Sequence, residues 1–173
     1  MLAEDERHQR LVRLYLYRLG YQRHDIRLLP VSGGRGSGEQ WVRERYSAEV
    51  REYRRRSARS RTALIVAIDA DTDEVDRRLR QLREATERAG LAARAIGEAI
   101  VHLIPKRNVE TWIWCLCGRP VDEITDYSQE VDVDGLIATA ALTFFEWSRA
   151  NATPPAYCVP SLAAAIPEVR RLE

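Results

Sequence analysis

The sequence has few of the residues that mark several common protein classes. Lys106 is its only lysine, although lysine and arginine together number 27. A GC-rich genome produces such an arginine bias without any functional reason. Three cysteines, Cys115, Cys117 and Cys158, are too few and too irregularly spaced for a zinc site or a disulfide framework. We therefore expect free thiols in a reducing compartment.

Long apolar runs and an excess of charge of one sign are also absent. No apolar stretch approaches the roughly 20 residues of a membrane-spanning helix, and no signal peptide precedes the first predicted strand. These absences predict a cytoplasmic protein without a membrane partner. The net charge is only +1, which excludes a global electrostatic attraction to nucleic acid. The length of 173 residues is sufficient for one domain with its own core.

Strand and helix patterns alternate over the first 107 residues. Short apolar runs predict strands at 1–3, 26–31, 63–68 and 99–104. Apolar residues at helical spacing predict helices over 11–19, 39–56 and 72–89. This alternation is typical of an α/β fold with a mostly parallel central sheet flanked by helices.

The pattern becomes helical after residue 107. Asn108 can cap a short helix, Asp134 can open a longer one over 135–149, and a last helix is expected over 161–171. We predict a single domain over 1–173, with an α/β core at 1–107 and a helical C-terminal extension at 108–173.

Two carboxylates follow the most apolar predicted strand. The run from Ala63 to Ile68 leads directly into Asp69 and Asp71, at the strand end where α/β sheets form ligand sites. Like charges at this spacing repel unless they share a cation, and oxygen ligands suit Mg²⁺ or Mn²⁺. The alternative is that Asp71 caps the next helix and Glu74 completes a capping box, which leaves Asp69 unexplained.

Glu4 follows the first predicted strand in the same way. The ends of neighbouring parallel strands meet, so Glu4 can join Asp69 and Asp71 as a third carboxylate around one or two divalent ions. The alternative is that Glu4, Asp5 and Glu6 are first-turn acids favoured by the helix dipole.

These features resemble the TOPRIM fold of topoisomerases, primases and related nucleases. A strand ending in glutamate is followed by a helix and then by an apolar strand ending in Asp69-x-Asp71. The segment 106–114 also resembles a motif of small stand-alone TOPRIM proteins of bacterial defence loci, related to the nuclease domains of overcoming-lysogenization-defect proteins. The resemblance covers roughly residues 1–115. Two departures are the nearly absent first strand and Asp5, where the family usually has glycine.

The resemblance implies a set of roles. Glu4 would be a general acid/base or metal ligand, Asp69 and Asp71 metal ligands, and Glu110 a further ligand. Lys106 would hold a phosphate or the transition-state charge. The resemblance also implies phosphodiester cleavage in anti-phage defence and a partner ATPase. Whether the chain forms a homo-oligomer stays open.

Two arginine-containing segments are candidates for binding nucleic acid, and we expect this nucleic acid to be DNA. The glycine-rich loop 32–38 carries Arg35, which can position a phosphate backbone if the loop is more than a connector. It lacks the endings of a P-loop or a dinucleotide fingerprint. The run at 51–61 contains Arg54, Arg55 and Arg56, which either bind phosphates or form a solvated helix face. His8, His24 and His102 are scattered, and we expect none of them to be ligands.

Three functions compete. The first is a metal-dependent TOPRIM-type nuclease or phosphotransferase. The second is the same fold with a degraded site, serving as an interaction module of an ATPase-containing complex. The third is a receiver-like signalling domain, which ranks last because Lys106 follows the fourth predicted strand, whereas a receiver needs its lysine after the fifth.

Overall fold

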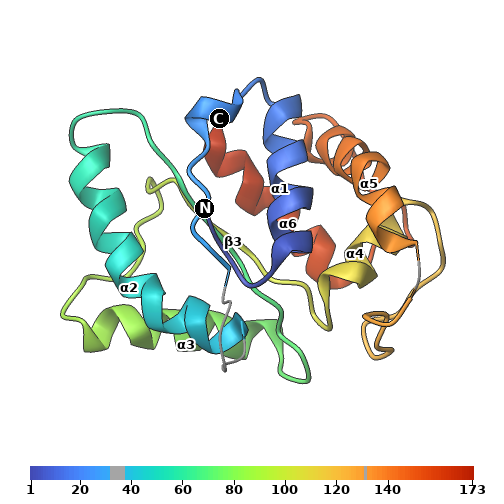
Figure 1. Ribbon diagram of the computed structural model, residues 1–173, viewed down its shortest axis with the longest axis horizontal. Coiled ribbons are helices and arrows are strands. Elements are labelled where there is room, and N and C mark those ends of the chain that lie inside the picture. Colours follow the sequence, from blue (N-terminus) through green and yellow to red (C-terminus); the bar gives the residue numbers. More distant parts are fainter. Residues whose placement is uncertain (32–37, 131) are drawn as a thin grey trace.

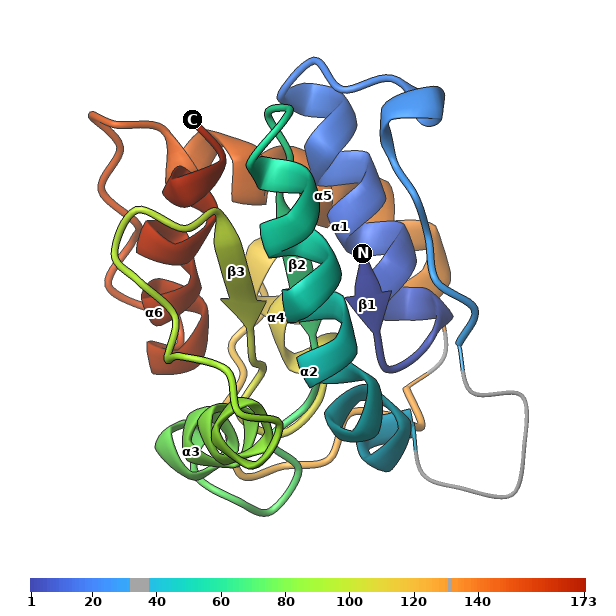
Figure 2. The ribbon, with the colours of Figure 1, turned by 90° about the vertical axis from the view of Figure 1, so that its left-hand side faces the viewer.

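Three parallel strands form the centre of the molecule. The computed structural model describes residues 1–31, 38–130 and 132–173. Strands β1 (Leu2–Ala3), β2 (Leu64–Ala67) and β3 (Ile100–Leu103) pair in the order β1-β2-β3. Figure 2 shows β2 between the other two. All strand residues are buried, as the unbroken apolar run of β2 predicts for a sheet covered on both faces.

Helices cover both faces of this sheet (Figure 1). One face carries α2 (Gly38–Ser57) and α3 (Val75–Arg88). The other carries α1 (Glu6–Arg18), α4 (Val109–Leu116), α5 (Val133–Ser148) and α6 (Pro160–Val169). Short 3-10 helices occupy Arg23–Asp25 and Arg170–Leu172. The predicted α/β class with a parallel sheet is confirmed, and the arrangement is consistent with a Rossmann-like fold.

Side chains of β2 alternate between two apolar cores, as expected for a strand. Ile65 and Ala67 belong to the core beneath α1, α4, α5 and α6. Leu64 and Val66 belong to the core beneath α2 and α3. The helices after residue 108 therefore form, together with α1, the helical layer on one face of the sheet. Within the described residues, none of the helices has the length and apolar character needed to cross a bilayer.

The strand predicted at 26–31 is wrong. This segment lies outside the sheet, although Leu29 is buried. Its main chain is instead bonded to Met1, the residue before β1, whose amino group donates to the Arg27 carbonyl and whose carbonyl accepts from the N–H of Leu29. No ladder follows, because β1 ends at Ala3 and leaves too short an edge. Lys106 consequently follows the third strand of the sheet and not the fourth.

Three predicted helix starts are tested by the structure. Asn108 caps α4 as predicted, since its side chain accepts from the N–H of Thr111 at 3.2 Å. Helix α5 begins at Val133 with Asp132 as N-cap, so Asp134 lies in its first turn. Helix α3 begins at Val75, later than predicted, because Asp71 has a left-handed φ of 57° and breaks the helical path.

The capping explanation of Asp71 is wrong. The N-cap of α3 is Glu74, and its side chain makes no capping hydrogen bond. Glu74 instead forms an ion pair with Lys106. Asp71 therefore adopts a costly backbone conformation in the segment after the central strand without capping the helix that follows.

Candidate active site

The parallel pairing of β1 with β2 brings two acids from distant parts of the chain into contact. The N–H of Glu4 continues the ladder by donating to the carbonyl of Ala67 at 3.0 Å. The N–H of Asp69 then donates to Oε2 of Glu4 at 2.9 Å. Glu4 and Asp69 thus meet at the carboxyl edge of the sheet, where α/β proteins form ligand sites.

The N-terminus of α2 closes over Glu4. A Cβ placed on Gly38 would lie 2.6 Å from the carbonyl oxygen of Glu4 and 2.7 Å from its Cγ. Only glycine fits this approach without displacing Glu4. The positive end of the α2 dipole is therefore close to the Glu4 side chain.

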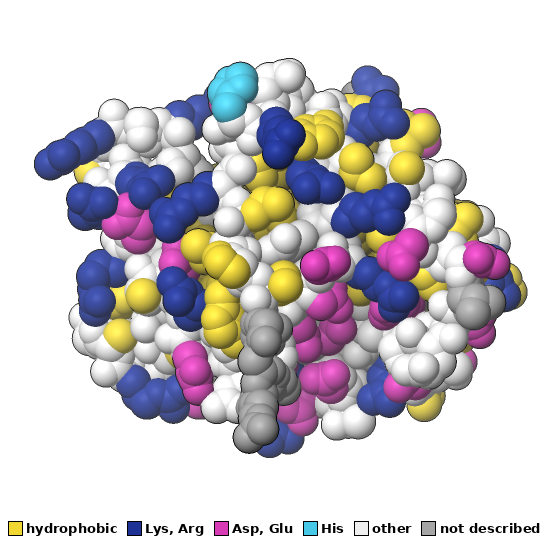
Figure 3. Space-filling view, viewed as in Figure 1, with side chains coloured by type: hydrophobic (Ala, Val, Ile, Leu, Met, Phe, Trp, Pro, Cys, Tyr) yellow, Lys and Arg dark blue, Asp and Glu magenta, His cyan; other side chains and the backbone are white. Residues whose placement is uncertain are grey.

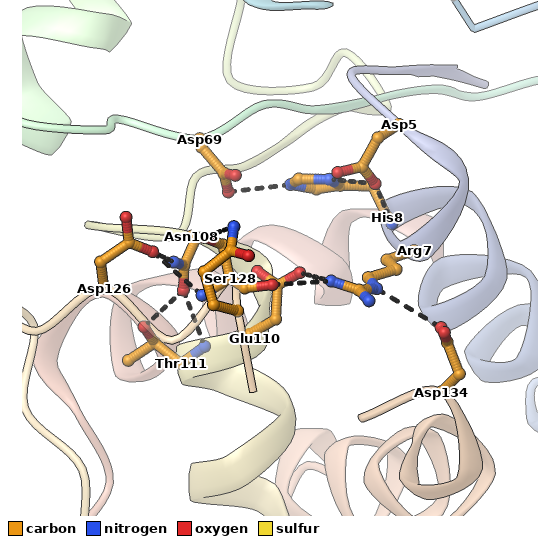
Figure 4. A network of polar contacts seen from close by, with 11 residues as sticks. Asp5, Arg7, His8, Asp69, Asn108, Glu110, Thr111, Asp126, Ser128 and Asp134 are labelled. Atoms are coloured by element: carbon orange, nitrogen blue, oxygen red, sulfur yellow. Dashed lines mark hydrogen bonds and ion pairs between the residues drawn. The ribbon is translucent and has the colours of Figure 1, made fainter. Parts of the chain in front are cut away.

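His8 links two acids on opposite sides of its ring (Figure 4). Its Nε2 lies 3.0 Å from Oδ1 of Asp69, and its Nδ1 lies 2.9 Å from Oδ1 of Asp5. Asp5 is also the N-cap of α1, because the same oxygen accepts from the backbone N–H of His8. His8 is 2% exposed, so the ring at the centre of this bridge is buried, while the Asp5 side chain at one end remains 47% exposed.

The ionisable groups in this network shift one another's pKa values. Burial and the neighbouring Asp69 raise the pKa of Glu4 to about 7. Burial raises the pKa of Asp69 to about 6, although His8 opposes the shift. Burial would also raise the pKa of Asp5, but hydrogen bonds from His8 outweigh it and lower that pKa to about 2. The two acids whose pKa values are raised well above the ordinary range are thus the two joined by the main-chain hydrogen bond at the sheet edge, and such raised pKa values are common in functional sites.

Glu110 joins the site through an arginine of α1. It is 4% exposed in the first turn of α4, and Oε1 accepts from Arg7 at 2.5 Å. Arg7 also reaches Asp134 at the start of α5 and the carbonyl of Ser128, each at 3.4 Å. Glu110 lies close enough to Asp69 to raise its pKa, so the structure brings this predicted residue near the site.

Asp71 lies at the exposed border of the same cluster. Its side chain is 55% exposed, and Oδ2 lies 3.4 Å from the guanidinium of Arg78. Its charge contributes to the raised pKa of Glu4. Arg78 is almost fully buried and donates from Nε to the carbonyl of Asp69 at 3.0 Å. This arginine of α3 therefore fixes the main chain between the two aspartates.

Lys106 and the arginine run do not join the cluster. Lys106 forms its ion pair with Glu74. Arg54 is bound to Glu98 and to the carbonyls of Ala92 and Ala93, while Arg55 and Arg56 pair with Glu52. From Gly38, which touches Glu4, to Arg54 is 16 residues of α2, or about 24 Å. Arg35 lies outside the described residues.

An open cavity of about 570 Å³ leads to Glu4. On the face shown in Figure 3, acidic side chains gather near the centre and basic side chains surround them. The cavity brings together the two residues between β1 and α1, residues of α1, Val31 and one residue of α5. It is lined by Glu4, Asp5, Glu6, Arg7, Arg10, Val31 and Asp134.

Sequence reasoning missed the groups that organise these acids, above all His8, Asp5 and Arg7. The available signal was local: Asp5 and His8 stand three residues apart at a helix start, the spacing of a capping pair. Nothing local links His8 to Asp69, which is 61 residues away. Within residues 1–31, 38–130 and 132–173, no three His, Cys, Asp or Glu side chains are arranged to hold a metal ion by themselves.

Comparison with models of known families, with curated proteins and with solved structures finds no match to this chain.

Proposed function

We propose that this chain is a metal-dependent phosphodiesterase of the TOPRIM type that acts on nucleic acid. The observation that carries the proposal is the hydrogen bond of 2.9 Å from the main-chain N–H of Asp69 to Oε2 of Glu4, which brings these two residues together at the carboxyl edge of the sheet. Two neighbouring acids with pKa values raised to about 7 and about 6 favour a cation beside them.

The donor set fits Mg²⁺ or Mn²⁺. Within the described residues, Oε1 of Glu4 and Oδ2 of Asp69 have no hydrogen-bond partner, and Asp71 adds an exposed carboxylate nearby. Magnesium sites in phosphoryl transfer commonly use one or two carboxylates, with water and substrate phosphate completing the shell. The lack of a three-residue metal cluster in the described part of the chain is therefore compatible with this class of site.

When bound, such a metal would neutralise the charge that develops on the phosphate oxygens. Glu4 and Asp69 would hold it, and the raised pKa of Glu4 suits that side chain to exchanging a proton with water or the leaving oxygen near neutral pH. Arg10 lines the cavity and can bind a neighbouring phosphate of the strand. Lys106 would have to leave Glu74 to reach a phosphate, so we assign it a secondary role.

A nicking assay tests this proposal. Supercoiled plasmid is incubated with the protein and Mn²⁺, and nicking is measured for the wild type, Glu4→Gln and Asp69→Asn. We expect both variants to lose at least a hundredfold in rate, because each removes a charge that would hold the metal. Glu6→Gln is the matched control, since Glu6 lines the same cavity from the exposed side of α1.

Metal binding is measured separately by thermal unfolding. At a Mn²⁺ concentration 100 times its Kd, binding should stabilise the wild type by about 2.7 kcal/mol and the two site variants by much less. Undiminished nicking by Glu4→Gln and Asp69→Asn, or equal melting curves with and without Mn²⁺, would contradict the proposal.

A specific observation favours a second function. His8 already takes one oxygen of Asp69, and Arg7 already takes one oxygen of Glu110. Such internal pairing suits a chain that has kept the fold as an interaction module within a larger, ATPase-containing assembly. Placement in anti-phage defence, and the ATPase itself, rest on the TOPRIM resemblance alone. Wild-type protein that neither nicks plasmid nor is stabilised by Mn²⁺ would favour this second function.

A further inference from the structure

Two of the three cysteines lie side by side, although they are far apart in the sequence. Cys115 is in the last turn of α4, and Cys158 is in the segment that joins α5 to α6. Both are free thiols in the structure, and their side chains are hydrogen-bonded to each other. The fold thus places two oxidisable sulfur atoms in direct contact.

The Cys115 sulfur is held over the segment that carries Cys158. It donates to the carbonyl of Tyr157 at 3.7 Å, and the backbone of Val159 hydrogen-bonds to it. Contacts therefore come from the residue before Cys158, from Cys158 itself and from the residue after it. Because three consecutive residues bind this sulfur, its approach to Cys158 does not depend on one side-chain rotamer.

Packing alone does not account for this arrangement. A buried cysteine can serve as a small apolar side chain, and such a role needs no second thiol. Cys117 has this role, since it packs partly buried against the same core and its thiol donates to the carbonyl of Leu136 at 3.8 Å. Among the described residues Cys117 has no thiol partner, so it is the natural comparison for the pair.

The two thiols of the pair differ in exposure. Cys115 is fully buried, whereas Cys158 is partly exposed in a turn in which its N–H donates to the carbonyl of Pro155 at 2.9 Å. A small solute can therefore reach the pair from the side of Cys158. A disulfide requires the two sulfur atoms to approach to about 2.05 Å. Cys158 lies outside the helices and strands, so its turn can absorb the small movement that bond formation needs.

A bond between these sulfur atoms would connect two elements that already touch. Nε1 of Trp112, in α4, donates to Oγ of Ser161, in α6, at 2.7 Å. The same hydroxyl accepts from the N–H of Lys106 at 3.2 Å. A disulfide would reinforce this junction, because it would close the chain from α4 to the start of α6 into a covalent loop that includes α5.

We propose that Cys115 and Cys158 form a reversible disulfide, with glutathione disulfide as the oxidant. The Cys158 thiolate attacks one sulfur of glutathione disulfide, forms a mixed disulfide and releases one glutathione thiolate. The Cys115 thiolate then attacks the Cys158 sulfur and releases the second glutathione thiolate. The two protons given up by the protein thiols end on the two glutathione thiols, so two protein thiols are oxidised and one glutathione disulfide is reduced.

The bond should form slowly at neutral pH, because the thiolate and not the thiol is the attacking species. Burial, together with the neighbouring Cys115 and Glu123, raises the pKa of Cys158 to about 12. Burial also raises the pKa of Cys115. The pair is therefore suited to a structural bond and not to rapid redox sensing, and its formation is best followed over hours at about pH 8.5.

The test is oxidation of the reduced, folded full chain by glutathione disulfide, followed by alkylation of the remaining thiols and peptide mass mapping. Trypsin leaves Cys115 and Cys117 together on peptide 108–119, and it leaves Cys158 on peptide 150–170. The mapping is therefore done on Cys117→Ser as well as on the wild type, so that a link between these peptides identifies Cys115. We expect this link in both proteins, and we expect dithiothreitol to remove it.

Thermal unfolding supplies a second readout. The oxidised wild type and oxidised Cys117→Ser should each melt roughly 5–15 °C above their reduced forms, because the bond restricts the unfolded chain. Cys158→Ser should show neither the linked peptides nor the rise in Tm under the same treatment. This variant keeps the test valid if Cys115→Ser does not fold, because it changes the partly exposed partner of the pair.

Three outcomes would overturn the proposal. The first is that Cys115 and Cys158 of the folded chain both stay free after oxidation. The second is that Cys158 keeps one bound glutathione while Cys115 remains a thiol. The third is a link that forms only in urea, since the folded structure would then not bring the sulfur atoms together. None of these outcomes bears on the proposed metal-dependent function, which involves other residues.

Discussion

Replacing Glu4 with glutamine should make the metal-free protein more stable. Burial and the contact with Asp69 raise the pKa of Glu4 from 4.5 to about 7, so the folded protein opposes its ionisation. A carboxylate whose pKa is raised by folding stabilises the folded state most at low pH. This contribution is lost as the pH rises from the unfolded pKa of 4.5 to the folded pKa of about 7. Above pH 7 the folded state therefore carries a charge that its surroundings disfavour.

The magnitude follows from the two pKa values. A carboxylate with a pKa of 4.5 unfolded and about 7 folded destabilises the native state by about 3 kcal/mol at pH 8, and by less than about 1 kcal/mol at pH 5. Glutamine keeps an oxygen that can accept from the N–H of Asp69 but carries no charge. We expect Glu4→Gln to gain about 1–3 kcal/mol at pH 8, because neighbouring groups readjust and absorb part of the effect.

The assay is thermal unfolding in EDTA at pH 8 and pH 5. For a chain of this size the expected gain raises Tm by roughly 3–10 °C at pH 8, with a much smaller change at pH 5. Glu6→Gln, on the exposed side of the same helix start, should change stability by less than about 0.5 kcal/mol at either pH. A Glu4→Gln protein that is no more stable than wild type at pH 8, or equally shifted at both pH values, would refute the reasoning.

Three further predictions concern parts of the fold around the site. Gly38→Ala should displace Glu4, lower the free energy of unfolding by about 1–3 kcal/mol and reduce the stabilisation by Mn²⁺ in the thermal-unfolding assay. His102, whose pKa is lowered to about 3 by burial and nearby Arg94, must stay neutral in the folded state. Protonation of this histidine in the unfolded state should therefore lower the free energy of unfolding by about 2 kcal/mol between pH 7 and pH 5. Because Glu4 shifts stability in the opposite direction over this range, the measurement is the difference between wild type and His102→Gln in a pH series of urea melts, and that difference should change by about 2 kcal/mol. Arg54→Ala should lower the free energy of unfolding by about 1–2 kcal/mol, because its contacts to Glu98 are lost. The salt dependence of DNA binding should stay unchanged in a filter-binding assay. A flatter salt dependence would instead indicate that Arg54 contacts the nucleic acid.

The central strand and the acids at its end were accessible from sequence. An unbroken apolar run such as Leu64–Ala67 predicts a strand buried on both faces, and the abrupt change to Asp69 marks its end. That Glu4 lies beside Asp69 then follows from parallel pairing, since adjacent strands end at the same edge. In these cases a local pattern and a general rule of sheet topology were sufficient.

The charge compensation of the site was not accessible in the same way. A lone histidine in an arginine-rich helix carries no local sign that it will reach Asp69, because that contact exists only after α1 packs on the sheet. The false strand at 26–31 has a related cause. Its apolar residues correctly indicated burial of Leu29, but burial does not determine whether a segment forms a ladder.

Lys106 illustrates a contact that the sequence does not report. Its position after a strand and its rarity suggested a catalytic cation, yet its partner is Glu74, at the N-cap of α3. Whether a surface cation is free or paired depends on side-chain rotamers across two separate loops, which periodicity and spacing do not report. The contacts of the Arg54 guanidinium with the loop before β3 were not predictable for the same reason.

Because β1 is so short, Glu4 should be held less stably in the site than Asp69. Asp69 follows the middle strand, which is hydrogen-bonded to a strand on each side. Glu4 follows an edge strand of only two residues. Local unfolding of β1 would separate Glu4 from Asp69 while the rest of the molecule stays folded. The amide of Glu4 should accordingly exchange its hydrogen for deuterium well before the amide of Ile68. A ligand or partner that holds residues 1–4 against β2 would therefore stabilise the arrangement of Glu4 beside Asp69.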